Sequence, residues 1–138
     1  MTSSAEATGW WLRTALGDLA AAQALVAIAS VPARASGQFA HQAAEKALKA
    51  AIASMGVEPA RTHDLVYLAL RCRADLRRDL APVDVGEPSA VLARSRYPGF
   101  GDALIARNEA VRWVSDATRI VELVASHCDL DLGSLKAV

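Results

Sequence analysis

The feature that most constrains the fold is an alanine-rich stretch, FAHQAAEKALKAAIASMG at residues 39–56, which predicts a helix enclosed on most sides. At 100° per residue, its polar side chains fall within an arc of about 100°. These side chains are Gln42, Glu45, Lys46 and Lys49. Apolar residues cover much of the remaining circumference: Ala43, Ala44, Ala47, Leu48, Ala51 and Met55. Because alanine lets neighbouring helices approach closely, we expect a central bundle helix with one open strip that carries two lysines.

Three further segments show helical periodicity, and no segment shows the alternation of a strand. Apolar residues recur at spacings of three and four in residues 9–29, 63–78 and 102–127, and a short helix is expected through residues 88–95. The length of 138 residues suits one domain with a single core. The sequence therefore predicts an all-α protein, an antiparallel bundle of four to five helices formed by residues 1–138.

Local signals suggest where these helices begin and end. Pro32 and Gly37 predict the connection before the alanine-rich helix, which we expect to stop at Gly56. Thr62 is the expected N-cap of the next helix, and residues 80–88 are expected to be irregular because they contain two prolines and a glycine.

The distribution of charge along the chain is more informative than its total. The formal net charge is zero, which argues against nucleic-acid binding driven by total charge. Arginines are nevertheless concentrated in residues 61–78 and 94–112. These two segments either converge on a surface that meets phosphates or an acidic partner, or form ordinary solvated helix faces.

Several classes of protein and site are not indicated. Cys72 and Cys128 lack the spacing of a metal site or a disulfide framework, so both are interpreted as small core residues. No apolar run is long enough for a membrane span, and the N-terminus does not resemble a secretory signal, so we expect a cytoplasmic protein. No glycine-rich loop suited to phosphate is present, and we expect neither a cofactor nor a metal.

Three short motifs, read together, carry a family resemblance. They are HQAAEKALKA at residues 41–50, THDL at residues 62–65 and SRYP at residues 95–98. In this order and spacing the chain resembles a HEPN domain, an all-helical family. The similarity includes the first helix and extends over nearly the whole chain. It implies a helical bundle that often forms a homodimer and is often encoded beside a small MNT-type nucleotidyltransferase, in pairs that behave as toxin and antitoxin.

The resemblance also implies a test for ribonuclease activity. Ribonuclease-like members carry an arginine, a polar residue and a histidine four to six residues after the arginine. Arg107 and Asn108 match the first two positions, but no histidine follows at that spacing. The nearest alternative is Arg34 with His41, where Ala35 replaces the polar residue. The leading hypothesis is therefore a non-catalytic module that works with a nucleotidyltransferase, and the alternative is a ribonuclease that uses an atypical Arg/His pair.

Candidate ligand-binding residues come from the same motifs. Any nucleotide or RNA contact is expected at Lys46, Lys49, Arg96 and Tyr97, because lysine and arginine neutralise phosphate and an arginine beside an aromatic ring can stack on a base. His63 and Asp64 are further candidates.

Each of these candidates has a structural alternative. Glu45 can pair with Lys49 along the helix, and Arg96 with Tyr97 can anchor a loop on the bundle. His63 can fix a loop, and Asp64 can cap a helix. The three tryptophans are expected in the core or in a dimer seam.

Overall fold

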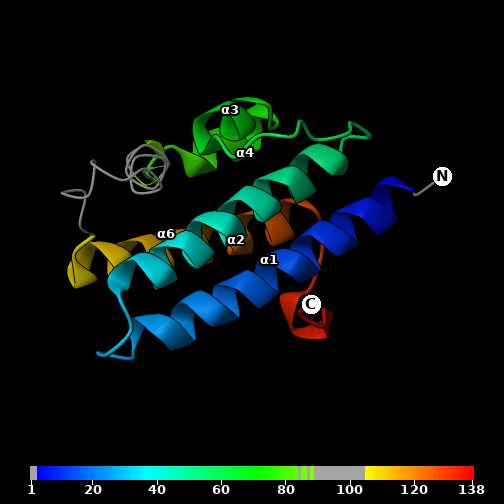
Figure 1. The fold of residues 1–138 in the computed structure, drawn as a ribbon. Helices are drawn as coiled ribbons and strands as arrows, with labels where there is room; N and C mark the ends of the chain where they lie inside the picture. Colours follow the sequence, from blue (N-terminus) through cyan, green and yellow to red (C-terminus); the bar gives the residue numbers. More distant parts are fainter. Residues whose placement is uncertain (1–2, 84, 87, 89–104) are drawn as a thin grey trace.

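The computed structural model describes residues 3–83, 85, 86, 88 and 105–138. Within these ranges the chain forms five α-helices and no strand, which confirms the predicted all-α bundle (Figure 1). The long helices are α1 (Ser4–Val26), α2 (Ala33–Ala53) and α6 (Arg107–His127). The short elements are α3 (Leu65–Leu70), α4 (Ala74–Leu80) and the 3-10 turn η1 (Leu132–Ser134).

Helix α2 occupies the centre of the bundle, as the alanine pattern predicts. It packs against α1, α6 and α3. Its alanines at positions 40, 43, 44, 47, 50 and 51 are at most 5% exposed, and small side chains let the helix axes approach closely. Met55 is 37% exposed, contrary to the prediction, because α2 ends at Ala53 and the chain then turns away. Gly56 makes this turn with a φ of +77°, in the role predicted for it.

The directions of the long helices follow from the connections (Figure 1). Helix α1 runs antiparallel to both α2 and α6, while α2 and α6 run in the same direction because the chain returns between them by way of α3 and α4. The last residues lie across α1, where the Val138 backbone N–H donates to the Arg13 carbonyl at 3.0 Å. No helix of the described part of the chain is both long and apolar enough to cross a membrane.

The first two helices begin earlier than predicted. Helix α1 starts at Ser4 instead of residue 9, because Ser3 and Glu6 form a capping box with hydrogen bonds of 3.1 and 3.2 Å. Helix α2 starts directly after Pro32, so the prediction that Gly37 lies in a connection is wrong. Gly37 is inside the helix and faces Trp113, whose ring would lie 3.2 Å from an added Cβ atom.

The segment predicted as one helix from residue 63 is two. Helices α3 and α4 are separated at Arg71–Arg73, and the N-cap of α3 is Asp64 instead of Thr62. The Asp64 carboxylate accepts hydrogen bonds from the backbone N–H groups of Val66 and Tyr67 at 3.0 and 3.3 Å.

The following segment is only partly described. Gly86 and Pro88 are already helical, since proline is tolerated in a first helical turn, whereas residues 89–95 of the expected short helix lie outside the described residues. Helix α6 begins at Arg107, and residues 105 and 106 before it are not helical.

Candidate functional site

The polar strip of α2 is centred on a buried glutamate that binds two partners. Glu45 Oε2 lies 3.0 Å from Lys49 Nζ, and Glu45 Oε1 lies 2.8 Å from His63 Nδ1. Glu45 and Lys49 are each 7% exposed. The predicted pairing of Glu45 with Lys49 is therefore present, but inside the protein. Burial of both charges is tolerated because each has a close partner.

The expectation of an open strip is wrong for most of its members, because the strip faces α1. Lys46 Nζ lies 2.6 Å from Asp18 Oδ2, and Lys49 Nζ lies 5.3 Å from the centre of the Trp11 ring. The long aliphatic stems of the two lysines allow them to pack between the helices while their ammonium groups find partners on α1. Gln42 is exposed, and 28% of the Lys46 side chain is accessible.

His63 links the loop before α3 to the interior of the bundle. Its ring is held by Glu45, yet 71% of the side chain is exposed. A carboxylate can only accept a hydrogen bond, so this contact places a proton on Nδ1 and, in the neutral ring, the lone pair on Nε2. His63 thus fixes the loop and presents the other edge of its ring to solvent. Asp64, beside it, is committed to capping α3.

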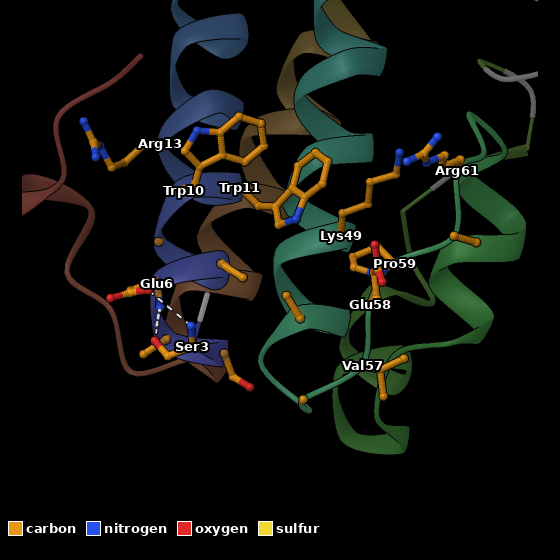
Figure 2. Close-up of a pocket in the computed structure, with 17 residues that line it drawn as sticks. Ser3, Glu6, Trp10, Trp11, Arg13, Lys49, Val57, Glu58, Pro59 and Arg61 are labelled. Atoms are coloured by element: carbon orange, nitrogen blue, oxygen red, sulfur yellow. Dashed lines mark hydrogen bonds between the residues drawn. The ribbon is translucent and has the colours of Figure 1, made fainter. Parts of the chain in front are cut away.

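A cleft of about 1230 Å³ opens beside Lys49 (Figure 2). It is lined by the first half of α1, the end of α2 and the loop of residues 56–61. Trp10 and Trp11 meet edge to face, with ring centroids 4.9 Å apart, and Trp10 is 52% exposed. Arg13 and Arg61 lie on opposite flanks of the cleft (Figure 2). Exposed aromatic rings and cations are groups that can bind a planar anionic ligand.

Sequence reasoning did not identify Trp10 or Arg61 as members of one cleft. The sequence did contain a signal that one of the two tryptophans faces outward. Adjacent helix positions diverge by about 100°, so only one of two consecutive tryptophans can join the apolar face. Trp11 occupies that face, so Trp10 had to point elsewhere. Trp113 is 3% exposed, which agrees with the predicted core position. The position of Arg61 depends on how the loop folds back, which local periodicity does not encode.

Arg107 has a clear structural role. Its guanidinium donates to the backbone carbonyls of Val26 at 3.3 Å, Ala29 at 3.4 Å and Val31 at 2.5 Å. These carbonyls belong to the end of α1 and the turn that follows it, where helical partners are missing. The side chain therefore joins the start of α6 to the α1–α2 connection.

The remaining catalytic candidates, Arg34 and His41, differ in their exposure to solvent. Arg34 is exposed on α2, whereas His41, two turns later, is 7% exposed and borders Trp113 and Asp116. Their separation along the helix is about 10 Å. Arg96 and Tyr97 lie outside the described residues.

A second charged cluster joins α4 to the end of α6. His127 Nε2 lies 2.8 Å from Asp79 Oδ2, and its Nδ1 lies 3.4 Å from Asp75 Oδ2. Burial would raise the pKa of Asp75, but the Leu76 backbone N–H, Arg73 and His127 together hold that pKa below its ordinary value of 3.8. His127, in the last turn of α6, thus joins the C-terminal end of that helix to α4.

The cysteines are free and have the properties of packed side chains. Cys72 is buried, and this burial raises the pKa of its thiol to about 11. Burial also raises the pKa of Cys128. Thiols with raised pKa values are poor nucleophiles, so neither residue adds chemistry to the cleft.

Comparison with known families gives one result. A family model described as "HEPN domain" matches residues 8–127, which is most of the chain. No curated protein and no solved structure matches. The matched range includes the strip of α2, His63, the capping Asp64 and Arg107.

Proposed function

The chain belongs to the HEPN domain family, and from this premise we propose that it is a non-catalytic, dimeric module acting with an MNT-type nucleotidyltransferase. The pair would behave as a cytoplasmic toxin and antitoxin, and this chain would contribute a nucleotide-binding surface. The whole of residues 1–138 would form one such domain.

The arrangement around Arg107 is the observation that carries the non-catalytic assignment. An arginine that stabilises a phosphorane-like transition state needs free donors directed at solvent or substrate. Here the guanidinium is bound to three backbone carbonyls of its own chain. Within α6, the histidine is His127, 20 residues later and about 30 Å along the helix. One chain therefore places no histidine near Arg107 on this helix.

The proposed nucleotide site is the cleft beside Lys49. Arg61 and Lys49 would bind phosphate oxygens, and Trp10 would stack on the base. Lys46 would hold α1 in register through Asp18, while His63 and Asp64 would position the loop that forms one wall. Arg96 and Tyr97 remain proposed additional contacts. The support for this site is the placement of a half-exposed indole between two arginine-bearing flanks.

The partner proposal is tested by co-expression with the nucleotidyltransferase encoded beside the gene, followed by affinity purification and light scattering. We expect a complex, and a dimer of this chain when it is purified alone. A monomer that never binds the transferase would contradict the proposal.

The ligand proposal is tested by calorimetry with adenine and guanine nucleotides. Arg61→Ala should weaken binding about tenfold, whereas Arg34→Ala, at an exposed arginine outside the cleft, should leave it unchanged. Equal affinities for both variants would place the ligand elsewhere.

The ribonuclease alternative has a direct test. Purified protein is incubated with RNA in the absence of metal, at high protein concentration. We expect intact RNA. Cleavage that disappears in His41→Ala, with an unchanged helical circular dichroism spectrum, would replace the proposed function with the ribonuclease reading based on Arg34 and His41.

A further inference from the structure

Helix α3 is apolar on the face that the described bundle leaves exposed. Its sequence is LVYLAL, without a charged residue. Leu65 and Leu68 are 2% and 0% exposed and join the core. On the other side Val66, Tyr67 and Leu70 are 41%, 39% and 61% exposed. Three residues at positions i, i+1 and i+4 lie within about 100° of helix surface, so they form one continuous face.

The fold itself does not require this face to be apolar. Leu65 and Leu68 already attach α3 to the bundle, and polar residues at the three exposed positions would be compatible with the same backbone. A cluster of large apolar side chains on a surface is typical of an interaction site. We call these three residues the α3 face.

Two arginines border the α3 face. The Arg71 guanidinium carbon lies 4.6 Å from the centre of the Tyr67 ring, and Arg77 Nη1 donates to the Leu70 carbonyl at 3.1 Å. Both arginines are exposed. Arginine and tyrosine at the edge of an apolar surface are the residue types enriched in protein interfaces.

Among the described residues, the acidic side chains of α4 and of the N-cap of α3 are engaged elsewhere. Asp64 caps the opposite end of α3. Asp75 and Asp79 both face His127 on α6. The border of the α3 face is consequently positive, although the formal charge of the whole chain is zero.

We propose that the α3 face binds an amphipathic segment of a partner protein whose apolar side chains are flanked by aspartate or glutamate. The apolar side chains of that segment cover Val66 and Leu70, and its carboxylates pair with Arg71 and Arg77. This inference goes beyond the proposed function, because it assigns a docking surface whether or not the partner is a nucleotidyltransferase.

Charge and polarity favour an acidic, amphipathic protein segment over two other occupants, a second copy of this chain and nucleic acid. A second copy of the chain, joined by a two-fold axis through α3, would set the same two arginines against themselves, and like charges across an interface are unfavourable. Nucleic acid would match the arginines, but the phosphates and sugars that dominate its surface are a poor match for an aliphatic centre formed by Val66 and Leu70.

The test places a photo-crosslinking amino acid at Val66 in the full-length protein in its native host, with Val111 as the matched control. Val111 is 51% exposed on α6, so both positions are accessible. We expect a protein adduct at position 66 and not at position 111, attached through a segment that contains acidic residues. An adduct with this chain, an adduct with nucleic acid, or no adduct would each overturn the proposal.

Binding measurements with the purified partner then show how much these residues contribute to its affinity. Leu70→Ser and the pair Arg71→Glu with Arg77→Glu should each weaken binding about tenfold or more, and salt should weaken the wild-type complex. Arg34→Glu is the control for a general charge effect. Equal binding by all variants would refute the docking surface. If the nucleotidyltransferase binds but cross-links at Val111, this inference fails while the proposed function stands. If a different protein cross-links at Val66 and the nucleotidyltransferase does not bind at all, the docking surface stands while the proposed function fails.

Discussion

Two glycines of α1 should respond differently to the same substitution, because only one of them lies beneath the end of the chain. An added Cβ atom at Gly9 meets nothing within 4 Å. At Gly17 it would lie 2.1 Å from the backbone oxygen of Val138, a distance that forces the C-terminal segment to move. Alanine in place of glycine inside a helix stabilises by about 1 kcal/mol when no contact is disturbed.

The loss at Gly17 can be worked out from the hydrogen bonds of the C-terminal segment. Val138 donates to the Arg13 carbonyl at 3.0 Å, and Arg13 Nε donates to the Lys136 carbonyl at 2.9 Å. Each bond contributes about 0.5–1.5 kcal/mol, so displacement of the segment costs about 1–3 kcal/mol. Gly9→Ala should thus stabilise by about 1 kcal/mol, whereas Gly17→Ala should range from neutral to about 2 kcal/mol destabilising.

Urea unfolding at 25 °C, followed by circular dichroism, measures both values. Deletion of residues 136–138 completes the comparison, because in the shortened chain Gly17→Ala should become stabilising by about 1 kcal/mol, as Gly9→Ala is. If Gly17→Ala stabilises the full-length chain as much as Gly9→Ala does, the C-terminal segment does not rest on α1 and the reasoning is refuted.

Three other outcomes follow from the packing and the charges. Arg107→Lys should lower the free energy of unfolding by about 1–3 kcal/mol in urea titrations, because one ammonium group cannot replace a planar guanidinium bound to three carbonyls; an unchanged midpoint would contradict this. Gly37→Ala should destabilise despite the better helix propensity of alanine, as thermal unfolding can show, because the added carbon would lie 3.2 Å from the Trp113 ring. The lowered pKa of Asp75 means that its contribution to stability is present above the unfolded-state pKa near 4 and is lost as the pH falls through the folded-state value. In Asp75→Asn, the free energy of unfolding should therefore fall less steeply below about pH 4 than in the wild type. The same pH dependence in both proteins would count against the Asp75 contacts.

Much of the fold could be predicted because periodicity reports which residues share a helix face. The alanine pattern by itself predicts that α2 lies at the centre of the bundle, and no segment of the sequence shows the alternation of a strand. Helix ends were less predictable, since they depend on single hydrogen bonds. The box of Ser3 and Glu6 extends α1, and Asp64 replaces Thr62 as a cap because its carboxylate reaches two backbone N–H groups.

The site was predicted less well than the fold, for a physical reason. A helical pattern shows that Glu45, Lys46 and Lys49 share a face, but it does not show what lies opposite that face. Lysines that extend from a narrow polar strip are equally suited to solvent and to a neighbouring helix that offers Asp18 and an indole ring. The sequence contained both possible partners, yet only their arrangement in space shows that the lysines are paired internally.

The same buried carboxylate connects the two surfaces proposed above. Glu45 holds Lys49 beneath Trp11 on one side and His63 on the other, so it lies between the cleft and the loop that leads into α3. The family motifs around these residues thus contribute first to positioning, because they fix the wall of the cleft and the start of α3 relative to α1. A ligand that displaced Lys49 from Glu45 would leave His63 as the partner of that carboxylate. The Glu45–His63 contact therefore offers one direct route by which the cleft and the α3 face can be coupled, because His63 directly precedes the N-cap of α3.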